Sequence, residues 1–135
     1  MATNSAGSKG QQYHTKQVHF LEKEITYADN GTAKTLGYLP PGAVVLEAGC
    51  VVTTAFNAGT TNTLNMGTDA DDDGFASLIA LGTIGRIAAD DMATSNDLYS
   101  TSERTITATV VLTGTAASAG AGIAYCTYII PASAR

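Results

Sequence analysis

The sequence lacks tryptophan and has few charged side chains. Asp, Glu, Lys and Arg make up 14% of its 135 residues, against roughly 25% in an average soluble protein. Threonine, serine, asparagine, alanine and glycine must therefore form much of the surface. Burying such a surface against another protein desolvates few ions. The composition favours a protein that works through protein contacts.

Basic residues are also scarce. The chain has seven Lys and Arg residues, which are scattered, and a net charge of −5. Nucleic-acid binding depends on clustered positive charge, so we expect no nucleic-acid partner. No apolar run reaches the roughly 18 residues of a membrane helix, and the opening residues Met1 to Ser8 contain no hydrophobic signal region. We expect no membrane partner, and synthesis in the cytoplasm without Sec export.

The two cysteines, Cys50 and Cys126, each lie in an apolar stretch rich in β-branched residues. Thiols in such surroundings, in a chain without an export signal, are more often reduced core residues than a disulfide. We interpret both as buried free thiols, with a disulfide as the less favoured alternative.

The length fits one domain. Residues 1–12 are polar, rich in Gly and Ser, and aperiodic, which predicts a flexible N-terminal arm. Residues 13–135 are expected to form a single β-sandwich domain. Turn signals interrupt it at Asn30-Gly31 and at Pro40-Pro41-Gly42.

Short apolar runs of period two predict seven or eight strands, and none of the segments reads as a long amphipathic helix. We expect an all-β fold, an antiparallel β-sandwich that is jelly-roll-like, with at most one short helix. That short helix, or a turn in its place, is expected at 75–82, after an Asp cap, because Phe75, Leu78 and Ile79 have helical spacing. The clearest strands are expected at 13–27, 44–56, 61–66, 105–113 and 123–130.

Strict alternation in 44–56 predicts the faces of that strand. Val44, Leu46, Ala48, Cys50 and Val52 should share one face, and the residues between them the other.

The sequence offers no catalytic constellation and no cofactor motif. The two histidines, His14 and His19, have an odd separation in one predicted strand, so they would face opposite sides of a sheet. The glycine-rich stretch Gly114 to Gly122 lacks the Lys-Ser/Thr ending of a phosphate loop, and a loop between strands explains it better. We therefore expect no enzyme activity and no cofactor.

One acidic segment resembles the start of a calcium loop. Asp69, Asp71 and Asp73, followed by Gly74, match D-x-D-x-D-G, with Ser77 at the ninth position. The match fails at position twelve, where Ala80 replaces the bidentate Glu. Asp69, Asp71 and Asp73 are thus weak metal candidates, and a solvated loop or a contact with a basic partner are the alternatives.

Two stretches resemble small structural proteins of tailed bacteriophages. The first starts at Leu39-Pro-Pro-Gly-Ala-Val and continues through Thr-Thr-Ala-Phe-Asn-Ala-Gly to Gly-Thr-Asp69; the second is Gly120-Ala-Gly-Ile-Ala-Tyr-Cys-Thr-Tyr-Ile129. In particular they look like the cement, or decoration, proteins of podophage heads. The resemblance spans roughly 39–130.

The resemblance implies a jelly-roll-like sandwich, a homodimer or homotrimer, and a place on the outer surface of the capsid across joints between major capsid proteins. It supplies no short motif for capsid contact, so no partner-binding residue is assigned. A tail, baseplate or head-fibre protein is the nearest alternative. An alternative of another class is a calcium-dependent carbohydrate-binding module, which the missing tryptophan disfavours.

Overall fold

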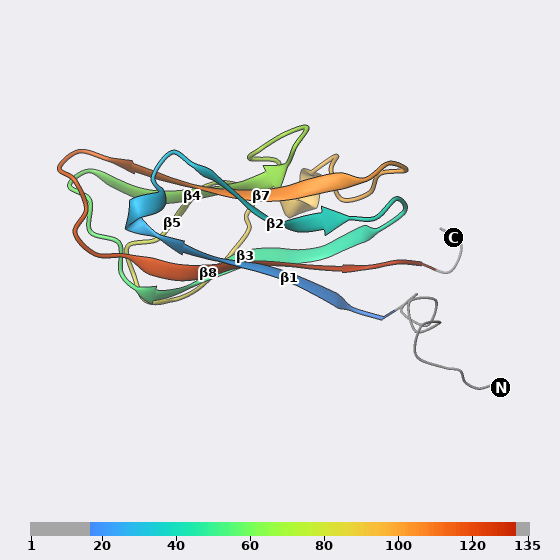
Figure 1. The fold of residues 1–135 in the computed structure, drawn as a ribbon, viewed down its shortest axis with the longest axis horizontal. Coiled ribbons are helices and arrows are strands. Elements are labelled where there is room, and N and C mark those ends of the chain that lie inside the picture. Colours follow the sequence, from blue (N-terminus) through green and yellow to red (C-terminus); the bar gives the residue numbers. More distant parts are fainter. Residues whose placement is uncertain (1–16, 132–135) are drawn as a thin grey trace.

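The computed structural model describes residues 17–131, which fold into two antiparallel sheets packed face to face (Figure 1). Two single-turn 3-10 helices, η3 (Tyr27–Asp29) and η4 (Met92–Thr94), are the helical elements of this part of the chain. The predicted all-β sandwich is confirmed, whereas the predicted arm at 1–12 lies outside the described residues. The strands are β1 (His19–Thr26), β2 (Ala33–Leu39), β3 (Val44–Thr54), β4 (Thr61–Thr68), β5 (Ala76–Ala80), β6 (Gly85–Ala88), β7 (Arg104–Thr113) and β8 (Ala121–Ile129).

The strand order is that of a jelly roll. One sheet runs β1-β8-β3-β6 and the other β2-β7-β4-β5. The first strand thus pairs with the last, the second with the seventh, the third with the sixth and the fourth with the fifth. This nested pairing is what results when one long hairpin rolls up into two sheets. In Figure 1, β4 and β7 lie in one layer, and β3 and β8 in the other.

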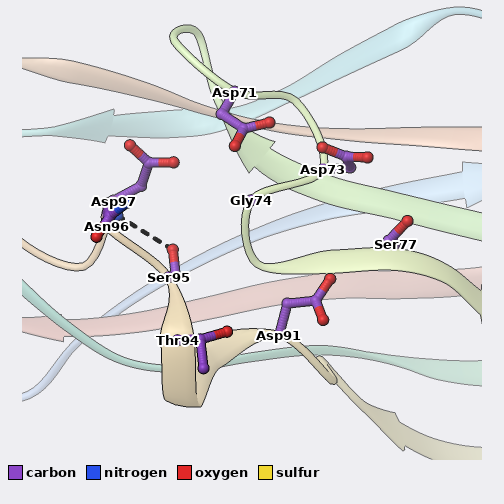
Figure 2. A pocket seen from close by; sticks show the side chains of 9 residues that line it. All are labelled: Asp71, Asp73, Gly74, Ser77, Asp91, Thr94, Ser95, Asn96 and Asp97. Carbon is purple, nitrogen blue, oxygen red and sulfur yellow. Dashed lines mark hydrogen bonds between the residues drawn. The ribbon is translucent and has the colours of Figure 1, made fainter.

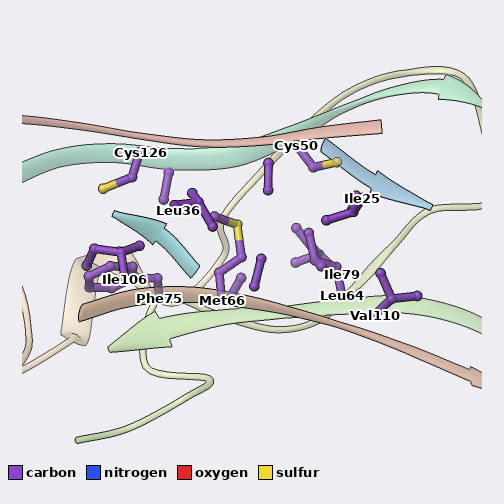
Figure 3. Packing of buried hydrophobic residues seen from close by; sticks show 14 of the residues in the cluster. Ile25, Leu36, Cys50, Leu64, Met66, Phe75, Ile79, Ile106, Val110 and Cys126 are labelled. Carbon is purple, nitrogen blue, oxygen red and sulfur yellow. The ribbon is translucent and has the colours of Figure 1, made fainter. Parts of the chain in front are cut away.

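A single apolar core fills the space between the sheets. Its members come from both layers: Cys50 and Cys126 from one sheet, Leu64, Ile106 and Val110 from the other (Figure 3). Each of these five side chains is fully buried. In β7 the buried positions alternate with threonines, as the period-two pattern predicts for a strand with one face on the core.

The short helix expected at 75–82 is wrong, because that segment forms β5. A bulge explains the misleading spacing. Ala76 pairs with Met66 and Ile79 with Leu64, so three residue steps on β5 match two on β4. Both Ala76 and Ile79 therefore point into the core, a spacing that also occurs on a helix. Leu78, within the bulge, has a φ of 57° and is half exposed.

The predicted faces of the 44–56 strand need a correction. The register shifts between Val45 and Glu47, so Val45 is buried together with Ala48, Cys50 and Val52. Leu46, which strict alternation places with the buried group, is 44% exposed. A β-bulge changes the face of every residue that precedes it.

Both predicted chain reversals are confirmed. Gly31 has a φ of 79° and Gly42 a φ of 85°, a left-handed conformation that glycine adopts without steric cost. No helix within 17–131 is long and apolar enough to cross a lipid bilayer.

Cys50 and Cys126 are free, buried thiols on the neighbouring strands β3 and β8, as predicted. Burial raises the pKa of Cys50 to about 11 and that of Cys126 to about 12, because a thiolate would have to form away from water.

We expect both thiols to be unreactive in the native protein. At pH 8 the thiolate fraction of Cys50 is below about one in a thousand, and attack on a disulfide reagent requires the thiolate. Ellman's reagent should therefore report almost no thiol in buffer and two per chain in urea. The unfolded chain loses these protons at lower pH than the folded one, so stability should fall as pH rises from about 9 towards 11. Rapid reaction in buffer would contradict the burial of these side chains.

Candidate functional site

An acidic pocket lies where the β4–β5 loop meets the segment around η4. Its volume is about 280 Å³. Figure 2 shows carboxylates from both segments around one open space, with Gly74 between them. The pocket is lined by Asp71, Asp73, Gly74, Ser77, Asp91, Thr94, Ser95, Asn96 and Asp97.

The β4–β5 loop turns tightly enough to bring its carboxylates back over the end of β4. Backbone hydrogen bonds join Thr68 and Asp71 in both directions, at 2.9 and 3.1 Å. A Cβ atom on Gly74 would lie 2.6 Å from Oδ2 of Asp97 and 3.2 Å from Oδ2 of Asp71. The absence of a side chain at this position lets both carboxylates approach the loop.

Like charge dominates the electrostatics of this pocket. The hydrogen bond with Asp71, then partial desolvation and then the negative charges of Asp71 and Asp72 raise the pKa of the partly exposed Asp73 carboxyl. The carboxylates of Asp71, Asp72 and Asp73 can bring one oxygen each within 4.8 Å of one another. A proton or a cation would relieve this repulsion.

The structure brings together only part of the predicted calcium loop. Asp71, Asp73 and Ser77 line the pocket, but Asp69 does not. Its Oδ1 accepts a 3.3 Å hydrogen bond from the backbone N–H of Thr105, which fixes it to the start of β7. Ala80 lies in β5. The arrangement is therefore not that of a twelve-residue calcium loop.

Sequence reasoning missed two carboxylates of the pocket. Asp91, the N-cap residue of η4, lines the pocket together with Asp97. No sequence signal links them to Asp71, because a contact between distant loops depends on strand order. Of the two histidines, His14 lies outside the described residues. His19 stacks on Tyr128, with ring centroids 5.0 Å apart.

The outer face of the β2-β7-β4-β5 sheet, which we call the threonine face, carries no charge at the outward strand positions within the described residues. Thr107 lies between Thr35 and Gly67, and Thr109 between Ala33 and Asn65. Further members of the threonine face are Tyr38, Thr61, Thr63, Ala80, Thr105, Val111 and Thr113.

Hydrogen bonds order part of the threonine face. The hydroxyls of Thr61 and Thr113 lie 2.7 Å apart across the strand pair, and Thr63 donates to the carbonyl of Val111 at 2.9 Å. Threonine side chains have few rotamers, so holding them in a contact costs little entropy.

The outer face of the β1-β8-β3-β6 sheet, which we call the aromatic face, is different. Tyr125 lies across Gly49, where any Cβ would meet its hydroxyl at 2.8 Å and the carbonyl oxygen of Ile87 at 2.5 Å. Arg86 Nε donates a 2.7 Å hydrogen bond to the Tyr125 hydroxyl. Phe20 stacks on Tyr125 with ring centroids 6.0 Å apart. Further members are Glu22, Glu24, Glu47, Val51, Ala88, Ile123 and Thr127.

Comparison with known proteins gives no sequence family, because no family model and no curated protein matches the chain. Solved structures that contain a chain of the same fold include three phage capsids. A chain of the Cyanophage Pam1 capsid matches 97% of this chain and 93% of its own length, with 19% identity and a TM-score of 0.65. A chain of the acidic stable capsid of Helicobacter pylori bacteriophage KHP30 matches 84% of this chain and 88% of its own length, with 20% identity and a TM-score of 0.63. A chain of the capsid of Ralstonia phage GP4 matches 85% of this chain and 85% of its own length, with 21% identity and a TM-score of 0.61. The fold of this chain thus occurs in phage capsid components.

The calcium hypothesis predicts a specific change in thermal stability. Millimolar calcium should raise the melting temperature relative to chelator, because a cation that binds only the folded pocket stabilises it. The double variant Asp71→Asn/Asp97→Asn should remove this shift, and Glu22→Gln, on the aromatic face, should leave it unchanged. Identical melting curves with calcium and with chelator would eliminate the hypothesis.

A second prediction concerns Gly49, whose missing side chain lets Tyr125 lie across β3 on the aromatic face. Gly49→Ala should lower the free energy of unfolding by about 1–3 kcal/mol, because the new methyl group overlaps a backbone oxygen. The matched control is Gly82→Ala, where nothing lies within 4 Å of the added carbon and φ is ordinary. Urea unfolding of both variants measures the difference. Equal free energies of unfolding for the two variants would show that Tyr125 can lie across β3 without a glycine at position 49.

Proposed function

We propose that the chain is a structural protein of a phage head, specifically a cement or decoration protein. It binds the outer surface of the capsid and stabilises contacts between major capsid proteins. The observation that carries this proposal is the fold match along nearly the whole chain with components of three phage capsids. Those chains are covered over 85–93% of their own length, so they too are small domains of this size.

The threonine face is the surface best suited to the capsid contact. It spans four strands and has no ionised group at its outward strand positions among the described residues, so burying those positions desolvates no charge. The acidic β4–β5 loop, which covers Gly67, borders the face at one end. The hydroxyls of the threonine face both donate and accept hydrogen bonds, so a mostly polar partner surface can be matched without paired charges. The sandwich places it on the side opposite the aromatic face.

Stabilisation of the shell follows from linkage. A protein that binds one arrangement of capsid subunits and not another shifts the equilibrium toward the bound arrangement, whatever the chemistry of the contact. Many weak copies act together, so each contact can be modest. This mechanism needs no catalytic group and no cofactor.

Charge placed on the threonine face should weaken capsid binding. We expect Thr107→Lys/Thr109→Lys and Thr107→Glu/Thr109→Glu both to reduce occupancy at least about tenfold, because either charge loses its water in the contact. The assay adds purified protein to heads that lack it and counts bound copies by cryo-electron microscopy. Ala116→Lys, in the exposed β7–β8 loop, is the matched control.

Wild-type occupancy by both double variants would remove the threonine face from the contact. A small number of copies at the tail, instead of a number close to that of capsid subunits, would overturn the cement proposal and would indicate a tail or baseplate protein.

A further inference from the structure

We propose that the free edge of β1 binds an extended segment of another protein that carries lysine or arginine at alternate positions. The segment adds a strand to sheet β1-β8-β3-β6, beside Glu22 and Glu24. This contact is separate from the threonine face and does not depend on the capsid proposal. Three features of the β1 edge support it: its regularity, the direction of its backbone groups and its unpaired charge.

The sandwich has four edge strands, and three of them are blunted. The register of β2 shifts between Thr35 and Gly37, β5 contains the bulge at Leu78, and β6 is only four residues long. Bulges and short lengths are common devices that keep an edge strand from pairing with another chain. The β1 edge has neither, because all eight residues of β1 pair with β8 without a register shift.

Hydrogen bonds at the end of β1 show which way its backbone groups point. Successive residues of a strand direct N–H and C=O to opposite sides in the plane of the sheet. Tyr27 N–H donates to the carbonyl of Gly120, the residue before β8, at 3.1 Å. Thr26 N–H donates instead to Oδ2 of Asp29, at 2.8 Å. The backbone of Tyr27 therefore faces β8, and the N–H of Thr26 faces away from it.

The same alternation assigns the rest of β1. In steps of two from Thr26, the N–H and C=O groups of Glu24, Glu22 and Phe20 point away from β8. Within residues 17–131, no strand pairs with this side of β1. Backbone donors and acceptors at three alternate residues are thus open to an added strand. This is the geometry that β-augmentation uses to bind an extended peptide.

The side chains of these residues lie on the aromatic face and shape the partner. Residues paired directly across strands point to the same side of a sheet. Glu24 pairs with Ile123, which is 37% exposed, and Phe20, at the other end of this row on β1, is 56% exposed. A lysine or arginine of the added strand can reach Glu22 or Glu24 while its methylene groups cover this apolar surface.

The charge of the edge selects a basic segment. Arg86, on the opposite border of the face, is already engaged with Glu47 at 3.7 Å and with Tyr125 at 2.7 Å. Among the described residues, Glu22 and Glu24 take part in no ion pair. Opposite charges across a strand pair are favourable and like charges are not. Two β1 edges paired antiparallel over their full length would set glutamate against glutamate, which disfavours a second copy.

Lys23 determines the residue between the two basic positions. It lies between Glu22 and Glu24, is exposed, and points to the other side of β1. The residue opposite Lys23 in the added strand points to that side too, where a basic side chain would be repelled. The preferred pattern is therefore basic, neutral or acidic, then basic. A continuous run of lysines fits this edge less well than an alternating one.

Titration of the full-length, ¹⁵N-labelled protein with a synthetic peptide tests the proposal by NMR. The probe is acetyl-Val-Thr-Lys-Thr-Lys-Thr-Val-amide, whose symmetric sequence sets its lysines opposite Glu22 and Glu24 in either strand direction. At about 50 mM salt we expect a dissociation constant on the order of 0.1–1 mM, because a short peptide loses conformational freedom on pairing. Hydrogen exchange at the amides of Phe20, Glu22 and Glu24 should slow several-fold at saturation.

Two altered peptides separate charge from strand pairing. Glutamate in place of both lysines should abolish measurable binding, because it meets the carboxylates of β1. Methylation of the two lysine backbone nitrogens should do the same, because it keeps the charge but removes the hydrogen-bond donors.

Protein variants locate the contact. Glu22→Gln/Glu24→Gln should weaken binding of the lysine peptide about three- to tenfold, since two cross-strand charge pairs are lost. The matched control is Glu103→Gln, which removes an exposed carboxylate from the segment before β7 and should leave binding unchanged. The amide spectrum of each variant shows whether its fold is retained.

Several results would overturn the proposal. No amide shift up to about 5 mM peptide would do so, as would equal binding of the methylated or the glutamate peptide, or unchanged exchange at Phe20, Glu22 and Glu24. Slow exchange at these three amides before any peptide is added would show that the edge is already occupied. Residues 1–12 are then the occupant if their deletion restores exchange, and a second copy is if dilution restores it. The count of copies on heads is independent of all these outcomes.

Discussion

Burial of one face of each sheet against the other is the constraint on which the rest of this structure depends. Side chains on a strand alternate between faces, so placing Ile106, Ala108 and Val110 in the core leaves their neighbours no choice but to point outward. The outward residues of β7 are mainly threonines for this reason. A one-residue slip of that strand would place threonines in the core and valine in water, which opposes any alternative register.

The two outer faces that result differ in chemistry. The threonine face is neutral and hydrogen-bonding, which suits a contact with a polar surface at low desolvation cost. The aromatic face combines an ordered arginine–tyrosine pair with carboxylates on the far border.

The sequence predicted what depends on periodicity and chain reversal. Local pattern predicts the strand type, the number of strands, the turns at Gly31 and Gly42 and the buried thiols. Prediction from the sequence failed where a β-bulge interrupts the two-residue alternation of side chains along a strand. At β5 the bulge gave Ala76 and Ile79 a helical spacing, and at β3 it placed Leu46 outside. A bulge is stabilised by the neighbouring strand, here by Asn65, whose side chain accepts a hydrogen bond from Leu78 N–H at 2.7 Å.

The acidic pocket and the aromatic face could not be predicted for a related reason. Asp97 approaches Asp71, and Arg86 approaches Tyr125, only because the jelly-roll order brings distant segments together. Neither pair has a fixed spacing along the chain that a motif could record.

The same reasoning accounts for a fold match without a family match. A jelly roll requires only that apolar residues alternate correctly and that turns occur at the right places, so many sequences satisfy it. A surface that functions through neutral contacts adds no invariant catalytic group, because threonine, serine, asparagine and alanine can replace one another on it with small changes in free energy. Identities of 19–21% over nearly whole chains are what these two requirements allow. The contacts proposed for this chain depend on how side chains are distributed over its two outer faces, and that distribution becomes visible only once the strand register is known.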